Sequence, residues 1–456
     1  MGILLEKKNG YDLISDKDRE AMENYSREYI SFMNSAKTER ECVNECIRMA
    51  EAKGFRAYET GMELKPGDKV YYNNRGKNID LAVIGRKPLS EGANIAAAHT
   101  DSPRLDLKPN PLYESEDLAY FKTHYYGGIK KFQWVTIPLE LHGVVCLKDG
   151  SKIELKLGQG DEPKFVITDI LPHLGKQQAA KPLGEAIPGE NLNLLIGSVP
   201  VSDPDAKERV KQYVMEILNE KYGMIEEDLL SAELETVPAF DATEIGFDRS
   251  LIGAYGHDDR VCAFAELKAL LDMEDIPERT AVCIFADKEE VGSMGVTGMI
   301  SQAFEHFMNE LCKAQGVDLY DCFSKSFCLS ADVTAALDPN FMEVFEPHNE
   351  ARINHGIGMC KYTGGRGKSG ASDASAETVA YIRKLFNDNG VIWQLSEMGK
   401  IDEGGGGTVA LDMANRNIET IDAGVPVLSM HAPFEVVSKL DCYMTYKGCK
   451  AVFEAK

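Results

Sequence analysis

Apolar positions near the start of the chain recur with a helical period. The pattern runs from Met22 to Met49, and Ser15 ahead of it offers a helix N-cap. Two short and continuous apolar runs follow at residues 78–85 and 94–101. Continuous runs of this length are typical of strands that are buried on both faces of a sheet. We therefore expect helices first and buried strands after them.

Between residues 103 and 245 the pattern changes. Three runs, at 132–147, 151–157 and 164–170, are rich in β-branched and aromatic residues and are separated by Asp-Gly and Gly-Asp turn signals. One helix is expected at 205–223, where the apolar positions return to a helical spacing. The region from 103 to 245 is therefore predicted to be a β-rich insertion.

After the insertion, strand and helix patterns alternate again. Such alternation predicts a mixed or parallel sheet with helices on both faces. The sequence thus predicts an α/β fold in which residues 1–102 and 246–456 build a central sheet flanked by helices, and residues 103–245 form a separate domain. The expected strands lie within 279–293, 326–333 and 391–397, and the expected helices at 258–273, 373–390 and 440–456.

Composition and charge narrow the function classes. The 456 residues are 44% hydrophobic and 27% charged, which is typical of a globular protein. Fifty Lys and Arg against 73 Asp and Glu leave a formal net charge of −23, which repels nucleic-acid phosphates and anionic lipids, so we expect neither nucleic acid nor a membrane as partner. The start of the chain lacks the apolar run of a signal peptide, and 11 Cys without a C-x-x-C pair favour reduced thiols, so a cytoplasmic location is expected.

Two groups of polar residues stand at the ends of predicted elements. His99 ends a buried strand, and Asp101 would share its face, where a carboxylate could orient an imidazole on a metal. A turn at Asp-Ser-Pro is the alternative interpretation. Asp258 and Asp259 follow His257 where a helix begins, and capping alone would need only one acid, so the pair favours a functional role.

Further candidates follow the same rule. Glu289 and Glu290 lie just beyond the apolar strand at 280–286, and loops beyond the carboxyl ends of parallel strands bind ligands in open α/β sheets. One carboxylate could ligate a metal while the other faces the open coordination position; a solvated pair of acids is the alternative. Asp332 and His431 also each follow an apolar run.

These groups predict a catalytic metal site. Imidazoles and carboxylates without a thiolate suit Zn²⁺, and cobalt or manganese would accept the same ligands. Three carboxylates and two divalent ions leave one positive charge, which a bridging hydroxide would neutralise, and that hydroxide is the nucleophile a hydrolase needs. Two divalent ions per subunit are therefore expected, on the candidate ligands His99, Asp258, Glu290, Asp332 and His431.

Five motifs give the chain a family resemblance: HTDSP at 99–103, the acid at 258, DKEEVGS at 287–293, SADV at 330–333 and MHAPFE at 430–435. They occur in the order seen in the aspartyl aminopeptidase/aminopeptidase I family, and the resemblance spans nearly the whole chain. It implies a zinc exopeptidase-like fold, an inserted dimerisation domain, and cytosolic complexes, typically tetrahedral dodecamers built from dimers.

The resemblance also implies how the metals are held. His99 and Asp332 would bind one zinc, Glu290 and His431 would bind the other, and Asp258 would bridge the two. Some members of the family carry Asp-Asn where this chain has two successive acids, but the bridging position falls on the first of them.

Catalytic and substrate-binding roles are implied in the same way. Glu289 resembles the general base and acid, and Asp101 the acid behind the imidazole ligand. His173, within the insertion, resembles an imidazole that a neighbouring subunit supplies to the oxyanion. Lys361 and Arg366 lie where an acidic-selective member would bind an Asp or Glu side chain, although a solvated basic loop is the alternative interpretation.

The expected activity is the removal of an acidic or neutral N-terminal residue from peptides. Two alternatives stay open at this stage. One is hydrolysis of another amide, such as an N-acyl amino acid. The other is a catalytically silent oligomeric scaffold.

Overall fold

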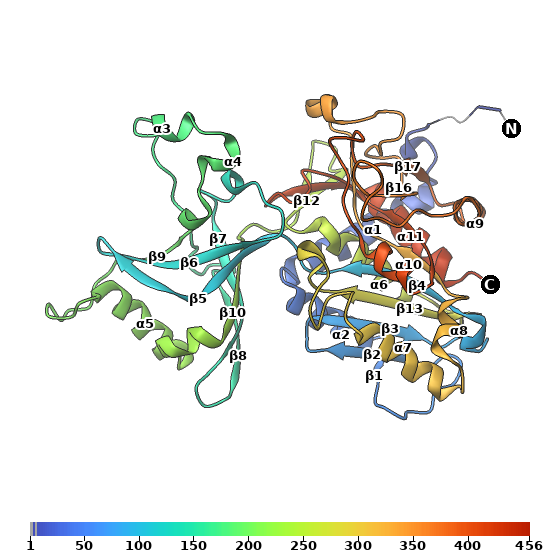
Figure 1. Ribbon diagram of the computed structural model, residues 1–456, viewed down its shortest axis with the longest axis horizontal. Coiled ribbons are helices and arrows are strands. Elements are labelled where there is room, and N and C mark those ends of the chain that lie inside the picture. Colours follow the sequence, from blue (N-terminus) through green and yellow to red (C-terminus); the bar gives the residue numbers. More distant parts are fainter. Residues whose placement is uncertain (1–2, 5–6) are drawn as a thin grey trace. The chain divides into compact units, whose positions relative to one another are not determined.

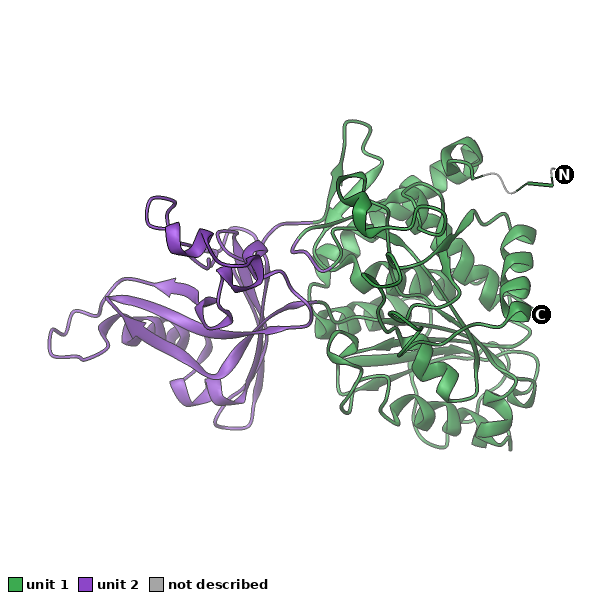
Figure 2. Cartoon of the chain, turned by 45° about the horizontal axis from the view of Figure 1, so that its top comes forward, with its two compact units in different colours: residues 1–102, 242–430, 434–456 green, residues 103–241, 431–433 purple. Residues whose placement is uncertain are grey.

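The computed structural model describes residues 3–4 and 7–456, so part of the chain start that was compared with a signal peptide lies outside the described residues. The chain divides into two compact units (Figure 2). Unit 1 comprises residues 1–102, 242–430 and 434–456, and unit 2 comprises residues 103–241 and 431–433.

Unit 1 is built on a nine-stranded mixed sheet (Figure 1). Its centre is parallel, because β13, β4, β14 and β18 run in one direction, whereas β3 and β16 run against them. The predicted α/β fold with a central mixed sheet is therefore confirmed. In spatial order the strands are β1 (Arg56–Ala57), β2 (Lys69–Asn74), β3 (Asn78–Val83), β13 (Thr280–Ala286), β4 (Ala93–His99), β14 (Phe327–Ser330), β18 (Glu419–Gly424), β16 (Ile357–Cys360) and β17 (Trp393–Ser396).

Helices cover both faces of this sheet, and alternate residues of a central strand point to opposite sides. In β4, Ala96 and Ala98 belong to one apolar core, whereas Ile95 and Ala97 belong to the other. The first core is shared with α1 (Asp16–Ser35), α2 (Glu39–Glu51), α6 (His257–Leu271), α9 (Ala376–Asp388) and α11 (Lys439–Phe453), and the second with α7 (Ala303–Ala314), α8 (Leu319–Phe323) and α10 (Val409–Asn415).

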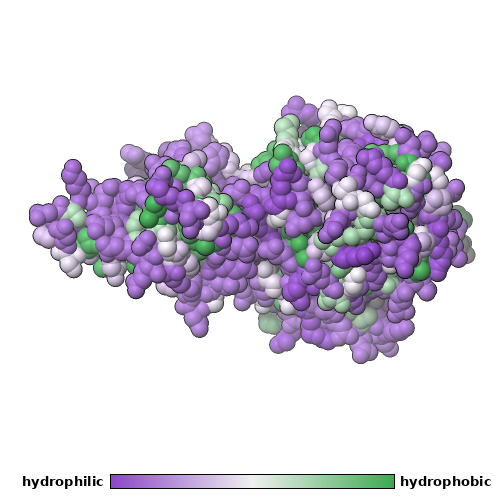
Figure 3. Space-filling model, turned by 90° about the horizontal axis from the view of Figure 1, so that it is seen from below, coloured by the Kyte–Doolittle hydropathy of each residue, from purple (hydrophilic) through white to green (hydrophobic). Residues whose placement is uncertain are grey.

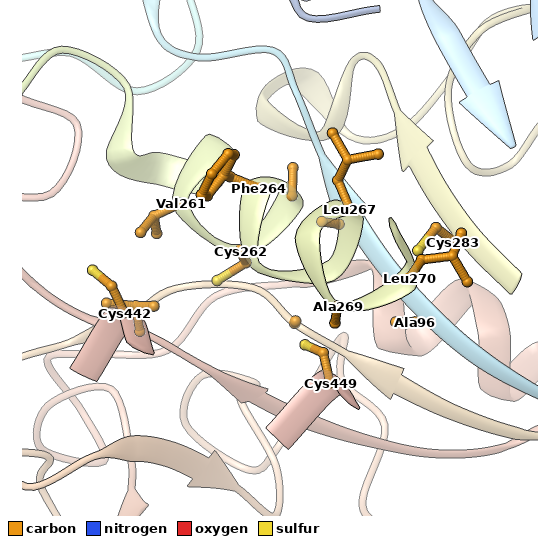
Figure 4. Close-up of a cluster of buried hydrophobic side chains, with 14 of the residues drawn as sticks. Ala96, Val261, Cys262, Phe264, Leu267, Ala269, Leu270, Cys283, Cys442 and Cys449 are labelled. Carbon is orange, nitrogen blue, oxygen red and sulfur yellow. The ribbon is translucent and has the colours of Figure 1, made fainter. Parts of the chain in front are cut away.

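Helix α6 is buried along its length and carries much of the first core. Figure 4 shows Cys262, Phe264 and Leu267 on this helix, with Cys442 and Cys449 of α11 packed nearby. All eleven cysteines of the chain lie among the described residues and are free thiols, ten of them buried. The cysteines therefore act here as small apolar core residues.

The long helix expected from residue 22 to 49 is two helices. Helix α1 ends at Ser35, and Thr38 then caps α2 by accepting a hydrogen bond from the Glu41 amide through its side chain. An N-cap hydroxyl accepts a hydrogen bond from an otherwise unpaired backbone amide, and it therefore favours the start of a second helix at this position. The predicted N-cap at Ser15 is confirmed, since its hydroxyl accepts from the Asp18 amide.

A smaller five-stranded sheet completes unit 1, with the spatial order β11 (Thr243–Ile245), β12 (Leu251–Ala254), β20 (Glu435–Ser438), β19 (Pro426–Leu428) and β15 (Thr334–Ala335). Among the described residues, none of the helices combines the length and the apolar character that crossing a bilayer would need. Most of the face shown in Figure 3 is hydrophilic, in keeping with the charge of the chain.

Unit 2 is a six-stranded antiparallel sheet with one long helix. Its strands follow the order β8 (Lys152–Leu157), β7 (Leu139–Cys146), β10 (Ala232–Pro238), β5 (Arg104–Ser115), β6 (Leu118–Tyr126) and β9 (Leu194–Gly197). The helices are α3 (Lys176–Ala179), α4 (Leu183–Ala186) and α5 (Arg209–Tyr222). The helix expected at 205–223 corresponds to α5.

Two strand predictions in this unit were wrong in extent. The run at 132–147 begins as a short 3-10 turn and becomes a strand only at Leu139, because Thr136 takes a positive φ and breaks the extended backbone. The run at 164–170 makes only isolated bridges, from Phe165 to Leu139 and from Val166 to Leu195. The residue composition of this run favours a strand, but a continuous ladder of backbone hydrogen bonds also needs a partner strand alongside it.

Candidate metal centre

Neighbouring parallel strands bring the candidate residues of unit 1 together. His99 is the last residue of β4 and pairs in register with Ala286, the last residue of β13. Glu289 and Glu290 begin the 3-10 turn that follows β13, and Asp332 lies just beyond β14, on the other side of β4. Because these strands are parallel, their carboxyl ends meet at one edge of the sheet.

One imidazole nitrogen faces three carboxylates. The Nε2 atom of His99 lies 3.2 Å from Asp258 Oδ1, 3.8 Å from Asp332 Oδ1 and 3.9 Å from Glu289 Oε2. His99, Asp258 and Asp332 are all buried, and Glu289 is half-buried. The arrangement leaves a set of oxygen and nitrogen atoms directed at a common space.

Asp101 fixes this arrangement from behind. One of its carboxylate oxygens lies 3.3 Å from Nδ1 of His99. The same oxygen accepts a hydrogen bond from the Glu289 amide at 3.1 Å, and the other oxygen accepts from the Glu290 amide at 3.2 Å. A single carboxylate therefore holds both the imidazole and the turn that carries the two glutamates. With Nδ1 engaged, Nε2 is the nitrogen left to bind a metal.

The charges in the centre are crowded and buried. Burial and the neighbouring Asp259 carboxylate raise the pKa of Asp332 well above its ordinary value. Burial alone lowers the pKa of His99, but its hydrogen bonds to Asp101 and Asp258 outweigh that effect and raise it. A divalent cation would reverse this balance, because it stabilises ionised carboxylates and a neutral imidazole.

Asp259 is part of the centre, although no separate role was predicted for it. Its Oδ2 accepts a hydrogen bond from the His99 amide at 3.3 Å, and its buried Oδ1 has no hydrogen-bond partner. Gly256, not an acid, occupies the N-cap position of α6, so capping does not explain the acidic pair. The pair itself was the available signal, but only the fold shows that the second acid also faces inward.

The donor atoms fit a divalent ion. Within the described residues, two sets each offer ligand atoms within 4.8 Å of one another. They combine a neutral nitrogen donor with carboxylate oxygens and lack a thiolate, which suits a catalytic zinc. The sets are His99 with Asp259 and Asp332, and His99 with Asp258 and Glu290.

Four other candidate residues are not members of these two ligand sets. His431 belongs to the segment 431–433 of unit 2, and its Nδ1 lies 2.8 Å from the Gly128 carbonyl oxygen. His173 is an exposed residue of unit 2. In unit 1, the Lys361 ammonium is paired with a neighbouring carboxylate, that of Asp373.

Arg366 lines a small cavity with the glycine-rich segment 399–405. Its backbone amide donates to the Ile401 carbonyl oxygen at 3.1 Å. The Arg366 guanidinium makes no ion pair with any described residue. Of the two cations proposed for substrate binding, Arg366 is therefore the one without a carboxylate partner of its own.

Known proteins resemble the chain over almost its whole length. The family model of peptidase M18, described as aminopeptidase I zinc metalloprotease, matches residues 32–453. A probable M18 family aminopeptidase 1 of Clostridium acetobutylicum is 48% identical over 458 residues, which covers 98% of each chain. A crystal structure of an M18 aminopeptidase from Thermotoga maritima has a TM-score of 0.95 and 44% identity, and the match covers 99% of this chain and 100% of that one.

A more distant similarity concerns the fold alone. A chain of the S. cerevisiae mApe1 dodecamer has a TM-score of 0.77 and 20% identity, with coverage of 96% of this chain and 97% of that one. The family match and the 48% identity carry the assignment. The chain therefore belongs to the M18 family of aminopeptidase I zinc metalloproteases, and it is a zinc-dependent aminopeptidase.

Proposed function

We propose that this aminopeptidase uses two divalent metal ions, most simply zinc, held on the cluster around His99. The observation that carries the proposal is the set of three carboxylates within 4 Å of one imidazole nitrogen, in a buried space at the carboxyl edge of the sheet. Bound zinc would polarise the scissile carbonyl and lower the pKa of a water molecule.

Each ligand has a role in this proposal. His99 and Asp332 bind one ion, Glu290 and His431 bind the other, and Asp258 bridges them. The assignments of His99, Asp332 and Glu290 are supported by the convergence of these residues in unit 1. Asp101 keeps the His99 ring and the glutamate turn in place through its contacts with both.

Glu289 is the proposed general base and acid. Its carboxylate faces the same space as His99 Nε2 and is the least buried of the three acids there, so it can reach a substrate that enters from solvent. It removes a proton from the attacking water and later delivers that proton to the leaving amine. His173 of a neighbouring subunit would donate a hydrogen bond to the oxyanion.

Assembly into a homo-oligomer is part of the proposal. Unit 2 is proposed as the dimerisation domain, and dimers would build a tetrahedral dodecamer in the cytoplasm. An active site enclosed in such a shell would accept short or unfolded peptides. The support is the family membership together with the fold shared with the chain of the mApe1 dodecamer.

The substrate is proposed to be a peptide with an acidic or neutral N-terminal residue. An acidic residue would be bound by Arg366, since the Lys361 ammonium is paired with Asp373. Comparing Asp-, Leu- and Lys-linked chromogenic substrates measures this preference. A blocked N-terminus should abolish cleavage, whereas an N-acyl amino acid hydrolase would keep such a substrate.

The sharpest test of the proposed chemistry is Glu289→Gln. We expect the variant to retain near-normal metal content and to lose about 10²–10⁴-fold in kcat, the range that general acid–base catalysis typically contributes. The exposed Glu63→Gln change is the matched control and should leave kcat unchanged. A Glu289→Gln enzyme that keeps a tenth of the activity would refute the role of Glu289 as base.

A further inference from the structure

A second cavity in unit 1 contains none of the residues of the metal centre. It encloses about 440 Å³ and lies beside β17, near the start of the chain. Figure 1 shows this N-terminal segment next to β16 and β17, and the Gly10 amide donates a hydrogen bond to the Asn354 carbonyl oxygen. The walls include Lys7, Lys8, His348, His355, Trp393 and Leu395.

Two cations at or beside this cavity, Lys7 and Arg352, donate hydrogen bonds to carbonyl groups. The Lys7 ammonium donates to the His348 carbonyl oxygen at 2.6 Å, and the guanidinium of the neighbouring Arg352 donates to the Pro347 carbonyl oxygen at 3.0 Å. Among the described residues, neither cation has a carboxylate within ion-pair distance. This is unusual in a chain whose net charge is −23.

The cations also act on one another. Burial and the nearby Arg352 guanidinium lower the pKa of Lys7, and burial, Arg352 and Lys7 lower the pKa of His355. Glu346 is the acid that acts in the opposite direction on Lys7. Its two oxygens, however, accept hydrogen bonds from the backbone amides of residues 348 and 349. The positive charges therefore share a space that an anion would stabilise.

The other residues that line the cavity indicate which chemical group is attached to the anion. Trp393 is half-buried, and its indole N–H donates to Asn387 Oδ1 at 2.8 Å, which fixes the ring plane. Ile392 and the partly exposed Leu395 add apolar surface. A fixed indole beside aliphatic side chains suits a flat apolar group, and the volume is sufficient for a small organic molecule.

We propose that this cavity binds a small organic monophosphate, with the phosphate held by Lys7 and His355, reinforced by Arg352, and a flat ring placed against Trp393. Charge-assisted hydrogen bonds to a dianionic phosphate are stronger than those to a neutral group, and more than one cation is available here. The site is distinct from the proposed peptide-cleaving centre. The monophosphate can therefore bind in the absence of a peptide substrate.

Intrinsic fluorescence can test this directly, because the chain has only two tryptophans and the other, Trp134, is fully buried in unit 2. We expect titration of the zinc-loaded protein with adenosine monophosphate to give a saturable change with a Kd below about 1 mM. Adenosine alone and inorganic phosphate should each bind at least about tenfold more weakly, because each lacks one half of the recognition.

Three variants complete the experiment. Lys7→Gln and Arg352→Gln should each weaken the binding of adenosine monophosphate about fivefold or more. Lys17→Gln, an exposed lysine on the nearby helix α1, should leave it unchanged. Aminopeptidase activity should be unaltered in all three, which also shows that they fold. Isothermal titration calorimetry of the unmodified protein provides a second readout that does not depend on Trp393.

Each of the remaining outcomes overturns the proposal. The first is that neither method detects saturable binding of adenosine monophosphate up to about 10 mM. The second is that inorganic phosphate or adenosine binds as tightly as adenosine monophosphate. The third is that Lys17→Gln weakens the binding of adenosine monophosphate as much as Arg352→Gln does.

Discussion

Among the places where unit 1 buries acids, two have very different surroundings. At the carboxyl ends of β4, β13 and β14, Asp258, Asp259 and Asp332 gather around one imidazole. In the middle of β3, Asp80 is fully buried, and neither of its carboxylate oxygens has a hydrogen-bond partner. Burial, together with the Glu305 carboxylate, raises the pKa of Asp80 to about 8.

This difference in surroundings shows which buried acids indicate a metal site. The charge of Asp80 is opposed by burial and by a second acid, Glu305, and protonation of Asp80 avoids it. The acids around His99 are several, they face a nitrogen donor, and Asp101 holds that donor in a fixed orientation. A raised pKa is therefore common to both places, and only the convergence of different ligand types distinguishes a metal site.

The largest expected effect comes from removing Asp258, the proposed bridging ligand. Asp258→Ala should lose bound zinc and lower kcat/KM by more than about a thousandfold, because two ions depend on one carboxylate in our proposal. Metal content by atomic absorption and hydrolysis of a chromogenic peptide measure both. Asp275→Ala, a change of an exposed acid, is the control. Full zinc content in Asp258→Ala would argue against the bridge.

Asp101→Asn should have a smaller effect. The amide can still accept one hydrogen bond, but it cannot pair with His99 and both glutamate amides as the carboxylate does. We expect zinc affinity or activity to fall about 10–100-fold, as is typical of partners behind a metal ligand. Competition with a chelator measures the affinity. An unchanged affinity and rate would mean that Asp101 only shapes the local backbone.

Asp80→Asn should stabilise the protein. The pKa of Asp80 is raised in the folded state, so ionisation favours the unfolded chain as the pH increases. Near pH 4, the free energy of unfolding of the variant should exceed that of the natural protein only slightly. The difference should grow by at most about 1.4 kcal/mol per pH unit and should become constant above about pH 8. Urea unfolding at pH 5, 7 and 8 at constant zinc concentration measures the gain. A difference that does not vary with pH would contradict this interpretation.

The smallest effects are expected in the basic loop. Lys361→Gln should change the ratio of kcat/KM for Asp- and Leu-linked substrates by less than about twofold, because its ammonium is paired with Asp373 and an exposed ion pair is weak. Arg366→Gln should lower that ratio more strongly if acidic residues are bound there. A larger change in Lys361→Gln than in Arg366→Gln would reverse the two assignments.

Local pattern was enough to predict the α/β fold and several strand ends. Largely apolar runs identified β3 and β4, because a strand buried on both faces is mostly apolar, and Asp80 is the exception in β3. His99 ends one such run and Glu289 lies just beyond another, so their place at the edge of the sheet could be predicted. Their roles in binding metal and moving protons stay predictions.

Long-range contacts decided the rest. The inward orientation of Asp259 depends on α6 meeting β4, and the pairing of Lys361 depends on a carboxylate twelve residues away. The cavity at Lys7 forms only because the N-terminal segment returns to β17, near the opposite end of the sequence. A sequence records which side chains follow a strand, since that is a local property of the chain. It does not record which charges face one another, because that is set by packing between elements that are distant along it.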